Sequence, residues 1–108
     1  MAQTGHPAKG SWSGYLTPEG SQQVRTRLLI NAHNGELSGD VNPGRNAVAF
    51  SSADLDAPNW GLVIKAPMPE GELVLTGTLS NLGSWTNRKY IGTYTLGNQQ
   101  GKFEFTLN

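Results

Sequence analysis

The sequence predicts an all-β fold, a single eight-stranded antiparallel up-and-down meander barrel. Segments in which apolar and polar residues alternate recur along the whole chain, and short turns rich in Gly, Pro and Asn separate them. No window places apolar residues at three- and four-residue spacing over three turns, so no helix is expected. Eight consecutive strands with one apolar face each bury those faces by closing on themselves. A two-sheet β-sandwich is the alternative.

The first four strands are expected at 10–17, 23–31, 35–42 and 47–56. Asn34 and Gly35 suit the tight turn between the second and third, because both residues tolerate positive φ. The fourth strand is the least regular, and a bulge is expected near Ser51 and Ser52. The side chains expected to point inward are Trp12, Gly14, Leu16, Val24, Thr26, Leu28, Ile30, Leu37, Gly39, Val41, Val48 and Phe50.

The last four strands are expected around 60–64, 73–79, 90–96 and 103–107. Pro67 to Gly71, Asn81 to Asn87 and Gly97 to Gly101 are the turns and loops between them. The inward side chains are again every second residue: Leu62, Ile64, Leu73, Leu75, Gly77, Leu79, Tyr90, Gly92, Tyr94, Leu96, Phe103, Phe105 and Leu107.

Length and composition bound the function. The chain has 108 residues, equal numbers of acidic and basic side chains (eight of each) and no cysteine. This length fits one domain, for which we expect a flexible N-terminal arm over 1–9 and the barrel over 10–108. Zero net charge argues against a nucleic-acid partner, no apolar run is long enough for membrane insertion, and the lack of cysteine excludes thiolate chemistry.

Four glycines fall on the predicted inner face, at 14, 39, 77 and 92. They have two compatible interpretations. Glycine lets short strands coil tightly enough to close a small barrel. Missing side chains at one level would also leave a ligand pocket, lined by Gly39, Gly77 and Gly92 beside Trp12, Tyr90 and Tyr94.

Three aromatic residues are expected outside the core. Trp85 falls in the longest loop, Trp60 begins a strand beside Asn59, and Tyr15 points outward. Aromatic rings beside Asn, Gln and Ser are what sugar rings bind. Trp60 and Trp85 are therefore candidate ligand-binding residues, although Trp85 could instead fold back over one end of the barrel.

The predicted outer face carries apolar side chains at Val63, Val74 and Ile91. Soluble barrels normally place polar residues there, so these three form a candidate homo-oligomer interface. Singly exposed residues are the alternative.

No catalytic residue, metal site or cofactor is predicted. His6 and His33 have no ligand spacing with Asp40 or Asp54, and no phosphate-binding loop or nucleophile elbow is present. Asp54 and Asp56 could form a carboxylate pair, but they border a surface turn.

Gly10-Ser-Trp12-Ser-Gly14, followed by Asn34-Gly-Glu-Leu-Ser-Gly39, resembles the first hairpin of the calycins, the lipocalin and avidin barrels. In lipocalins a late basic residue packs over this Trp, and Arg88 is the nearest candidate. The helix that lipocalins carry before their last strand is not expected here. His6-Pro7, Asn42-Pro43-Gly44 and Asn81-Leu82-Gly83-Ser84 are similar to segments of small bacterial domains without a settled function. Those domains tend to be exported, and this likeness with the polar start at 2–9 leads us to expect a periplasmic or secreted protein.

Four functions follow as hypotheses. The first is a non-catalytic barrel that binds a small apolar or aromatic ligand. The second is a carbohydrate- or surface-binding module that uses Trp60, Trp85 and Tyr15. The third is a cofactor-free isomerase or cyclase, and the fourth is a structural oligomer with a filled core.

Overall fold

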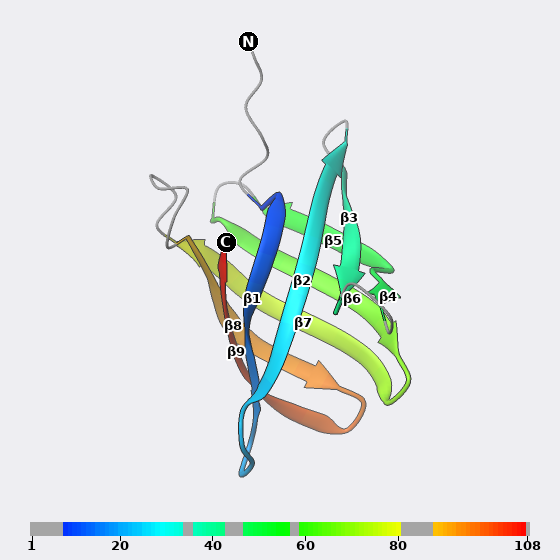
Figure 1. Cartoon of the computed structure of the whole chain (residues 1–108), viewed down its shortest axis with the longest axis vertical. Coiled ribbons are helices and arrows are strands. Elements are labelled where there is room, and N and C mark those ends of the chain that lie inside the picture. Colours follow the sequence, from blue (N-terminus) through cyan, green and yellow to red (C-terminus); the bar gives the residue numbers. More distant parts are fainter. Residues whose placement is uncertain (1–7, 34–35, 43–46, 57–58, 81–87, 108) are drawn as a thin grey trace.

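The computed structural model describes residues 8–33, 36–42, 47–56, 59–80 and 88–107, and these ranges contain nine strands and no helix (Figure 1). No segment of the described chain is therefore a helix of the length and apolarity that a membrane crossing requires. The strands are β1 (Gly10–Pro18), β2 (Val24–His33), β3 (Glu36–Val41), β4 (Val48–Ala49), β5 (Ser52–Asp56), β6 (Gly61–Met68), β7 (Gly71–Ser80), β8 (Lys89–Leu96) and β9 (Gln99–Leu107).

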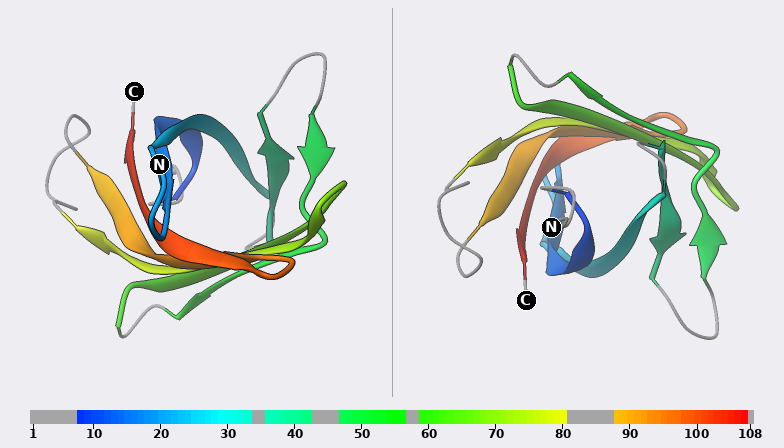
Figure 2. Two further views of the ribbon diagram at one scale, coloured as in Figure 1. Left: turned by 90° about the horizontal axis from the view of Figure 1, so that it is seen from below. Right: turned by 90° about the horizontal axis from the view of Figure 1, so that it is seen from above.

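All nine strands belong to one antiparallel sheet in the order β4-β3-β2-β1-β9-β8-β7-β6-β5. Every strand pairs with its neighbour in the chain except β4 with β5, and the first long strand pairs with the last. Seen end-on, the sheet curls around a central axis, with β1 and β2 across from β6 and β7 (Figure 2). The prediction of an all-β, barrel-like meander is confirmed. The described strands form a single curled sheet, which is not the alternative sandwich of two.

The expected fourth strand, 47–56, is broken into β4 and β5. The break lies at Phe50 and Ser51, where a bulge was expected. The Phe50 amide donates to the Gly39 carbonyl of β3 (2.9 Å), and the next amide, of Ser51, donates to the Lys65 carbonyl of β6 (2.7 Å). Two consecutive residues thus bond to strands near the two opposite edges of the sheet, and these bonds bring the edges together. The break also gives nine strands in place of the predicted eight.

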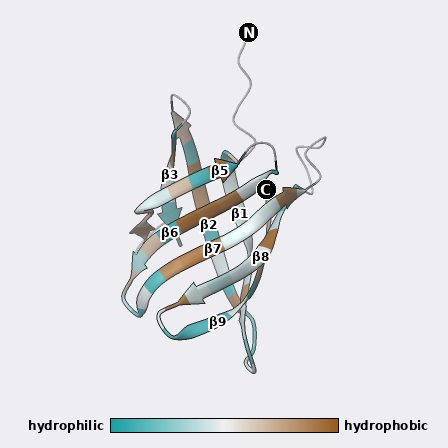
Figure 3. Ribbon diagram, turned by 180° about the vertical axis from the view of Figure 1, so that it is seen from behind, coloured by the Kyte–Doolittle hydropathy of each residue, from teal (hydrophilic) through white to brown (hydrophobic). Residues whose placement is uncertain are grey.

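The alternation of side chains follows the predicted pattern closely. In β7, Leu73, Leu75 and Leu79 are buried, whereas Val74, Thr76 and Thr78 face outward. Figure 3 shows a continuous hydrophobic stretch in each of β6 and β7, because the half-buried Val63 and Val74 lie between buried aliphatic residues. The buried hydrophobic residues are Ala8, Trp12, Leu16, Leu28, Ile30, Val41, Leu62, Ile64, Ala66, Leu73, Leu75, Leu79, Tyr90, Tyr94, Phe103, Phe105 and Leu107.

Aromatic rings of the core lie opposite glycines on neighbouring strands. Gly14 pairs with Phe105 and Gly92 pairs with Phe103. The ring of Phe103 reaches past Gly92 to Gly77, where its Cζ would be 2.7 Å from an added Cβ. Gly77 therefore provides space that the Phe103 ring occupies, whereas Gly14 and Gly92 allow neighbouring backbones to approach closely.

Gly101 lies inside β9, which begins at Gln99, and not in the turn that the sequence predicts over 97–101. It pairs with Tyr94 on β8 and with Pro18 on β1. A side chain there would collide with the Thr17 carbonyl, so Gly101 serves the close approach of strands rather than a turn.

One end of the curled sheet, which we call the filled end, is packed with aromatic side chains. Trp12 and Tyr90 are fully buried, with their ring centroids 6.4 Å apart. The Trp12 Nε1–H donates to the Ala8 carbonyl (2.9 Å), so the predicted arm is packed on the barrel from Ala8 onward. Arg88 is 3% exposed and lies in one cross-strand row with Trp12, with Leu107 between them.

A Gly92→Ala substitution tests whether the glycines are steric requirements. An added Cβ would collide with the backbone carbonyl of Thr76, which cannot rotate away. We expect a loss of about 2–3 kcal/mol in the free energy of unfolding, measured by urea denaturation. Gly61→Ala is the matched control, because its Cβ would meet only an ordinary contact at 3.9 Å, and a change within about 0.5 kcal/mol is expected. Equal losses in the two variants would contradict this account.

Candidate functional site

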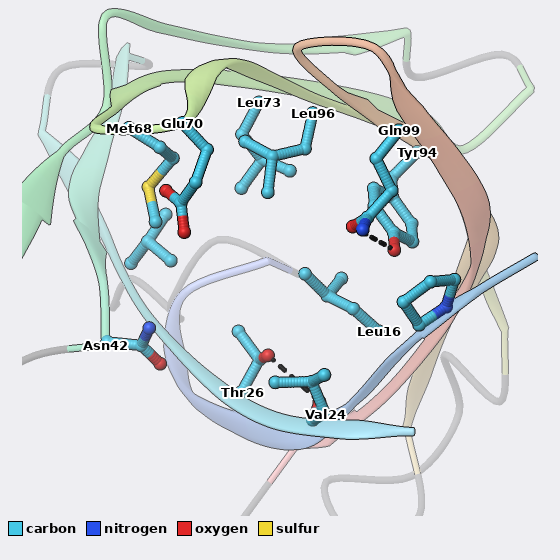
Figure 4. Close-up of a pocket in the computed structure, with 12 residues that line it drawn as sticks. Leu16, Val24, Thr26, Asn42, Met68, Glu70, Leu73, Tyr94, Leu96 and Gln99 are labelled. Carbon is cyan, nitrogen blue, oxygen red and sulfur yellow. Dashed lines mark hydrogen bonds between the residues drawn. The ribbon is translucent and has the colours of Figure 1, made fainter. Parts of the chain in front are cut away.

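The other end of the barrel, which we call the open end, holds a pocket of about 310 Å³. It lies where β1, β3, β6 and β8 finish and where β2, β7 and β9 begin. Its walls come from both halves of the curled sheet, and their side chains converge on a common space (Figure 4). The lining residues are Leu16, Pro18, Val24, Thr26, Val41, Asn42, Met68, Glu70, Leu73, Tyr94, Leu96 and Gln99.

The pocket has an apolar floor and a polar rim. Leu16, Val41 and Leu73 are buried residues of the floor, and the ring of Tyr94 is buried beside them. Asn42, Glu70 and Gln99 are exposed at the rim. An apolar surface that is recessed behind polar groups is the usual arrangement of a small-molecule site.

The rim amides are held in fixed orientations. The backbone N–H of Asn42 donates to the Arg27 carbonyl (2.8 Å). The side-chain Oδ1 of Asn42 accepts a hydrogen bond from the backbone N–H of Arg27 (3.2 Å). Asn42 has a left-handed φ of 52°, a conformation that Asn adopts more readily than most residues. Since its Oδ1 is engaged, its Nδ2 remains as a donor for a ligand.

Tyr94 and Gln99 form the second polar element. The Tyr94 hydroxyl donates to the Gln99 Oε1 (3.0 Å), which leaves the Gln99 Nε2 as a donor (Figure 4). Burial raises the pKa of the Tyr94 phenol above its ordinary value of 10.0, so the hydroxyl stays protonated and keeps donating this bond. In the buried part of the pocket lining, the Thr26 hydroxyl donates a hydrogen bond to the Val24 carbonyl (3.1 Å).

Of the predicted interior ligand-binding residues, Tyr94 lines the pocket. Trp12 and Tyr90 do not, because they belong to the filled end. Gly77 and Gly92 lie beneath the Phe103 ring. A Cβ added to Gly39 would lie 3.0 Å from the Phe50 ring. The space above these three glycines is therefore occupied by protein.

The predicted sugar-binding aromatics are not brought together. Trp60 is 37% exposed in the connection before β6, and its φ of 54° is unusual for a bulky residue. Tyr15 lies on the outer face of β1, with the Arg25 guanidinium 6.0 Å from its ring centroid. Strands β7, β8 and β9 lie between β1 and β6 in the sheet, so the two aromatics are not on neighbouring strands. Trp85 lies outside the described residues.

The predicted interface residues lie on the outer face but not in one continuous patch. Val63 pairs with Thr76, and Val74 pairs with Lys65, so these two are diagonal neighbours and half-buried. Ile91 is 43% exposed and pairs with Thr78, which is about 13 Å along β7 from Val74.

The rim residues Asn42, Glu70 and Gln99 and the lining residue Met68 were not singled out from the sequence, which assigned them to turns or to no site. A signal was available. In a meander, alternate connections lie at the same end of the barrel, so those after β1, β3, β6 and β8 must meet. Glutamate, asparagine and glutamine in such connections are therefore candidates for one shared rim.

Comparisons with known proteins leave the family open. No family model, no curated protein and no solved structure matches the chain. The resemblance to calycins therefore stays a prediction.

Within the described ranges, no three His, Asp or Glu side chains are grouped as a metal site would need, and Asp54 and Asp56 are exposed on β5.

Tyr90 predicts a pH dependence of stability. Its hydroxyl donates to the Leu62 carbonyl (2.6 Å), and burial raises its pKa above the ordinary 10.0. Above pH 10 the unfolded chain loses this proton while the folded chain keeps it. The free energy of unfolding should therefore be undiminished below about pH 10 and fall above it, by about 1.4 kcal/mol per pH unit for this residue.

Tyr90→Phe should remove that component of the slope. It should also cost about 1–2 kcal/mol at neutral pH, because the buried hydrogen bonds of the hydroxyl to the Leu62 and Leu75 carbonyls are lost. Urea unfolding at several pH values between 7 and 11, on both proteins, measures the difference. Parallel stability curves would show that Tyr90 ionises equally in both states.

Proposed function

We propose that this protein is a non-catalytic binding module that takes one small apolar ligand into the pocket at its open end. The observation that carries the proposal is the contrast between the two ends. Trp12, Tyr90 and Phe105 pack the filled end, whereas the floor beneath Asn42 and Gln99 is apolar, recessed and accessible. Packing of the filled end supports the barrel without a ligand, so the pocket at the other end is free to bind one.

The size of the pocket limits the ligand. At about 310 Å³ it lies at the lower end of the range for small-molecule sites, roughly 300–1,000 Å³. It is roughly twice the volume of an engineered 150 Å³ cavity that binds benzene. A ligand with one ring and a short aliphatic chain therefore suits it better than a lipid with a long chain.

The lining residues favour binding over catalysis. Glu70 and Tyr94 are the ionisable side chains among the twelve, and the Tyr94 hydroxyl is already engaged with Gln99. General acid–base catalysis commonly needs two groups with different pKa values that face one reacting centre. An isomerase or cyclase barrel is thus the weaker hypothesis.

Phenylbutanol, a neutral compound with one ring and a short chain, tests the proposal. Titrated into ¹⁵N-labelled protein, it should shift the side-chain amide signals of Asn42 and Gln99 and the backbone signals of Leu73 and Leu96. We expect saturable binding with one site, because these residues surround a single pocket.

Val24→Trp should block this binding. Val24 is 54% exposed at the rim, so a larger side chain there covers the mouth without disturbing the core. Ile91→Trp is the matched control, since Ile91 is 43% exposed on the outer face. Unchanged amide signals in the parent protein at the solubility limit of phenylbutanol, or equal binding by Val24→Trp, would refute the proposed site.

A further inference from the structure

We propose that the pocket selects apolar ligands that carry a positive charge, with Glu70 as the residue that binds the charged group. This inference rests on the binding function proposed above, and it names the class of ligand. A primary amine attached to a ring by a short aliphatic chain is the simplest member of that class.

Glu70 is placed to do this by the connection between β6 and β7. Met68 ends β6 and Gly71 begins β7, so Glu70 lies at the turn on the rim. Its carboxylate is directed over the pocket, on the same side as Met68 and across from Gln99 (Figure 4). It is the one charged side chain among the twelve lining residues.

Within the described part of the chain, no lysine or arginine forms an ion pair with the Glu70 carboxylate. The ion pair found there joins Lys89 to Glu104 on the outer face. The described turn residues of the open end carry Glu19 and Glu70 and no lysine or arginine. The formal charges of these described turn residues are therefore both negative, which favours a cation over an anion. Arg45 belongs to the connection 43–46, which lies outside the described residues.

The other rim groups complement the carboxylate. Asn42 and Gln99 each have their oxygen engaged, by the Arg27 N–H and the Tyr94 hydroxyl respectively, and each presents NH₂ donors. The acceptor for a ligand's donor group is consequently Glu70. Hydrogen bonds that involve an ion are roughly twice as strong as neutral ones, so the carboxylate should dominate selectivity.

Solvent at the rim limits the size of the effect. An ion pair that is exposed to water is weak, because solvent and salt screen it. We therefore expect the amine to bind about two- to fivefold more tightly than the matched alcohol at low salt. The preference should diminish as the ionic strength rises.

Three probes with a common apolar body test the inference: phenylbutylamine, phenylbutanol and phenylbutyrate. Dissociation constants come from amide chemical shifts for the parent protein, Glu70→Gln and Glu72→Gln. Glu72 is the matched control, because it is an exposed glutamate two residues away on the outward side of β7. We expect the order amine, alcohol, carboxylate for the parent and for Glu72→Gln. In Glu70→Gln the preference for the amine over the alcohol should be lost, so that the ratio of their dissociation constants approaches one.

The outcomes separate the two proposals. If none of the three probes binds the parent protein, the proposed function fails and this inference fails with it. If the alcohol binds as tightly as the amine, or Glu70→Gln keeps the preference, the pocket stands and the role of Glu70 is refuted. If Glu72→Gln loses the preference for the amine as fully as Glu70→Gln does, the preference comes from the overall charge of this end of the barrel. If phenylbutyrate binds most tightly of the three probes, a basic group such as Arg45 is indicated. Either result overturns the inference. Matching amide spectra without ligand show that each variant is folded.

Discussion

The close fit of aromatic rings against glycines is the constraint on which the rest of this barrel depends. Phe105 faces Gly14, Phe103 covers Gly92 and Gly77, and Tyr90 lies against both phenylalanines, with ring centroids 6.4 and 4.7 Å away. A small barrel has room for these rings only where opposite side chains are missing. The glycines therefore do not leave the interior empty. They allow it to be filled with the largest side chains of the chain.

The same constraint explains why the pocket lies where it does. The rings of Phe103, Phe105 and Tyr90 occupy the middle and one end of the barrel, and Tyr94 is the aromatic residue nearest the other end. Beyond it the lining is aliphatic, with Leu73, Leu96 and Leu16. These side chains are too short to meet across the barrel, so a space remains. The pocket therefore begins at the level of the barrel axis where the aromatic side chains of the core end.

Much of this fold could be predicted from the sequence, because alternation reports directly on which face of a strand a residue occupies. It identified Trp12, Leu28 and Phe105 as inward-facing and located the irregularity at Ser51. Alternation does not report the level of a residue along the barrel axis, which depends on register and strand tilt. For that reason Gly77 and Gly92 were expected beside a cavity, although Phe103 fills it, and Val24 was expected inside although it lies at the rim.

The candidate site was harder to predict for a related reason. Its polar groups belong to connections far apart in sequence, and their proximity follows only from closure of the sheet. That closure is local, because the amides of Phe50 and Ser51 bond to β3 and β6, the strands next to the two edge strands of the sheet. Asn42 follows β3 and Met68 ends β6, so this one junction brings together the two sides of the rim. Binding at the open end should therefore depend on the junction as much as on the residues that touch a ligand, while the packing of Trp12 and Tyr90 maintains the barrel independently of both.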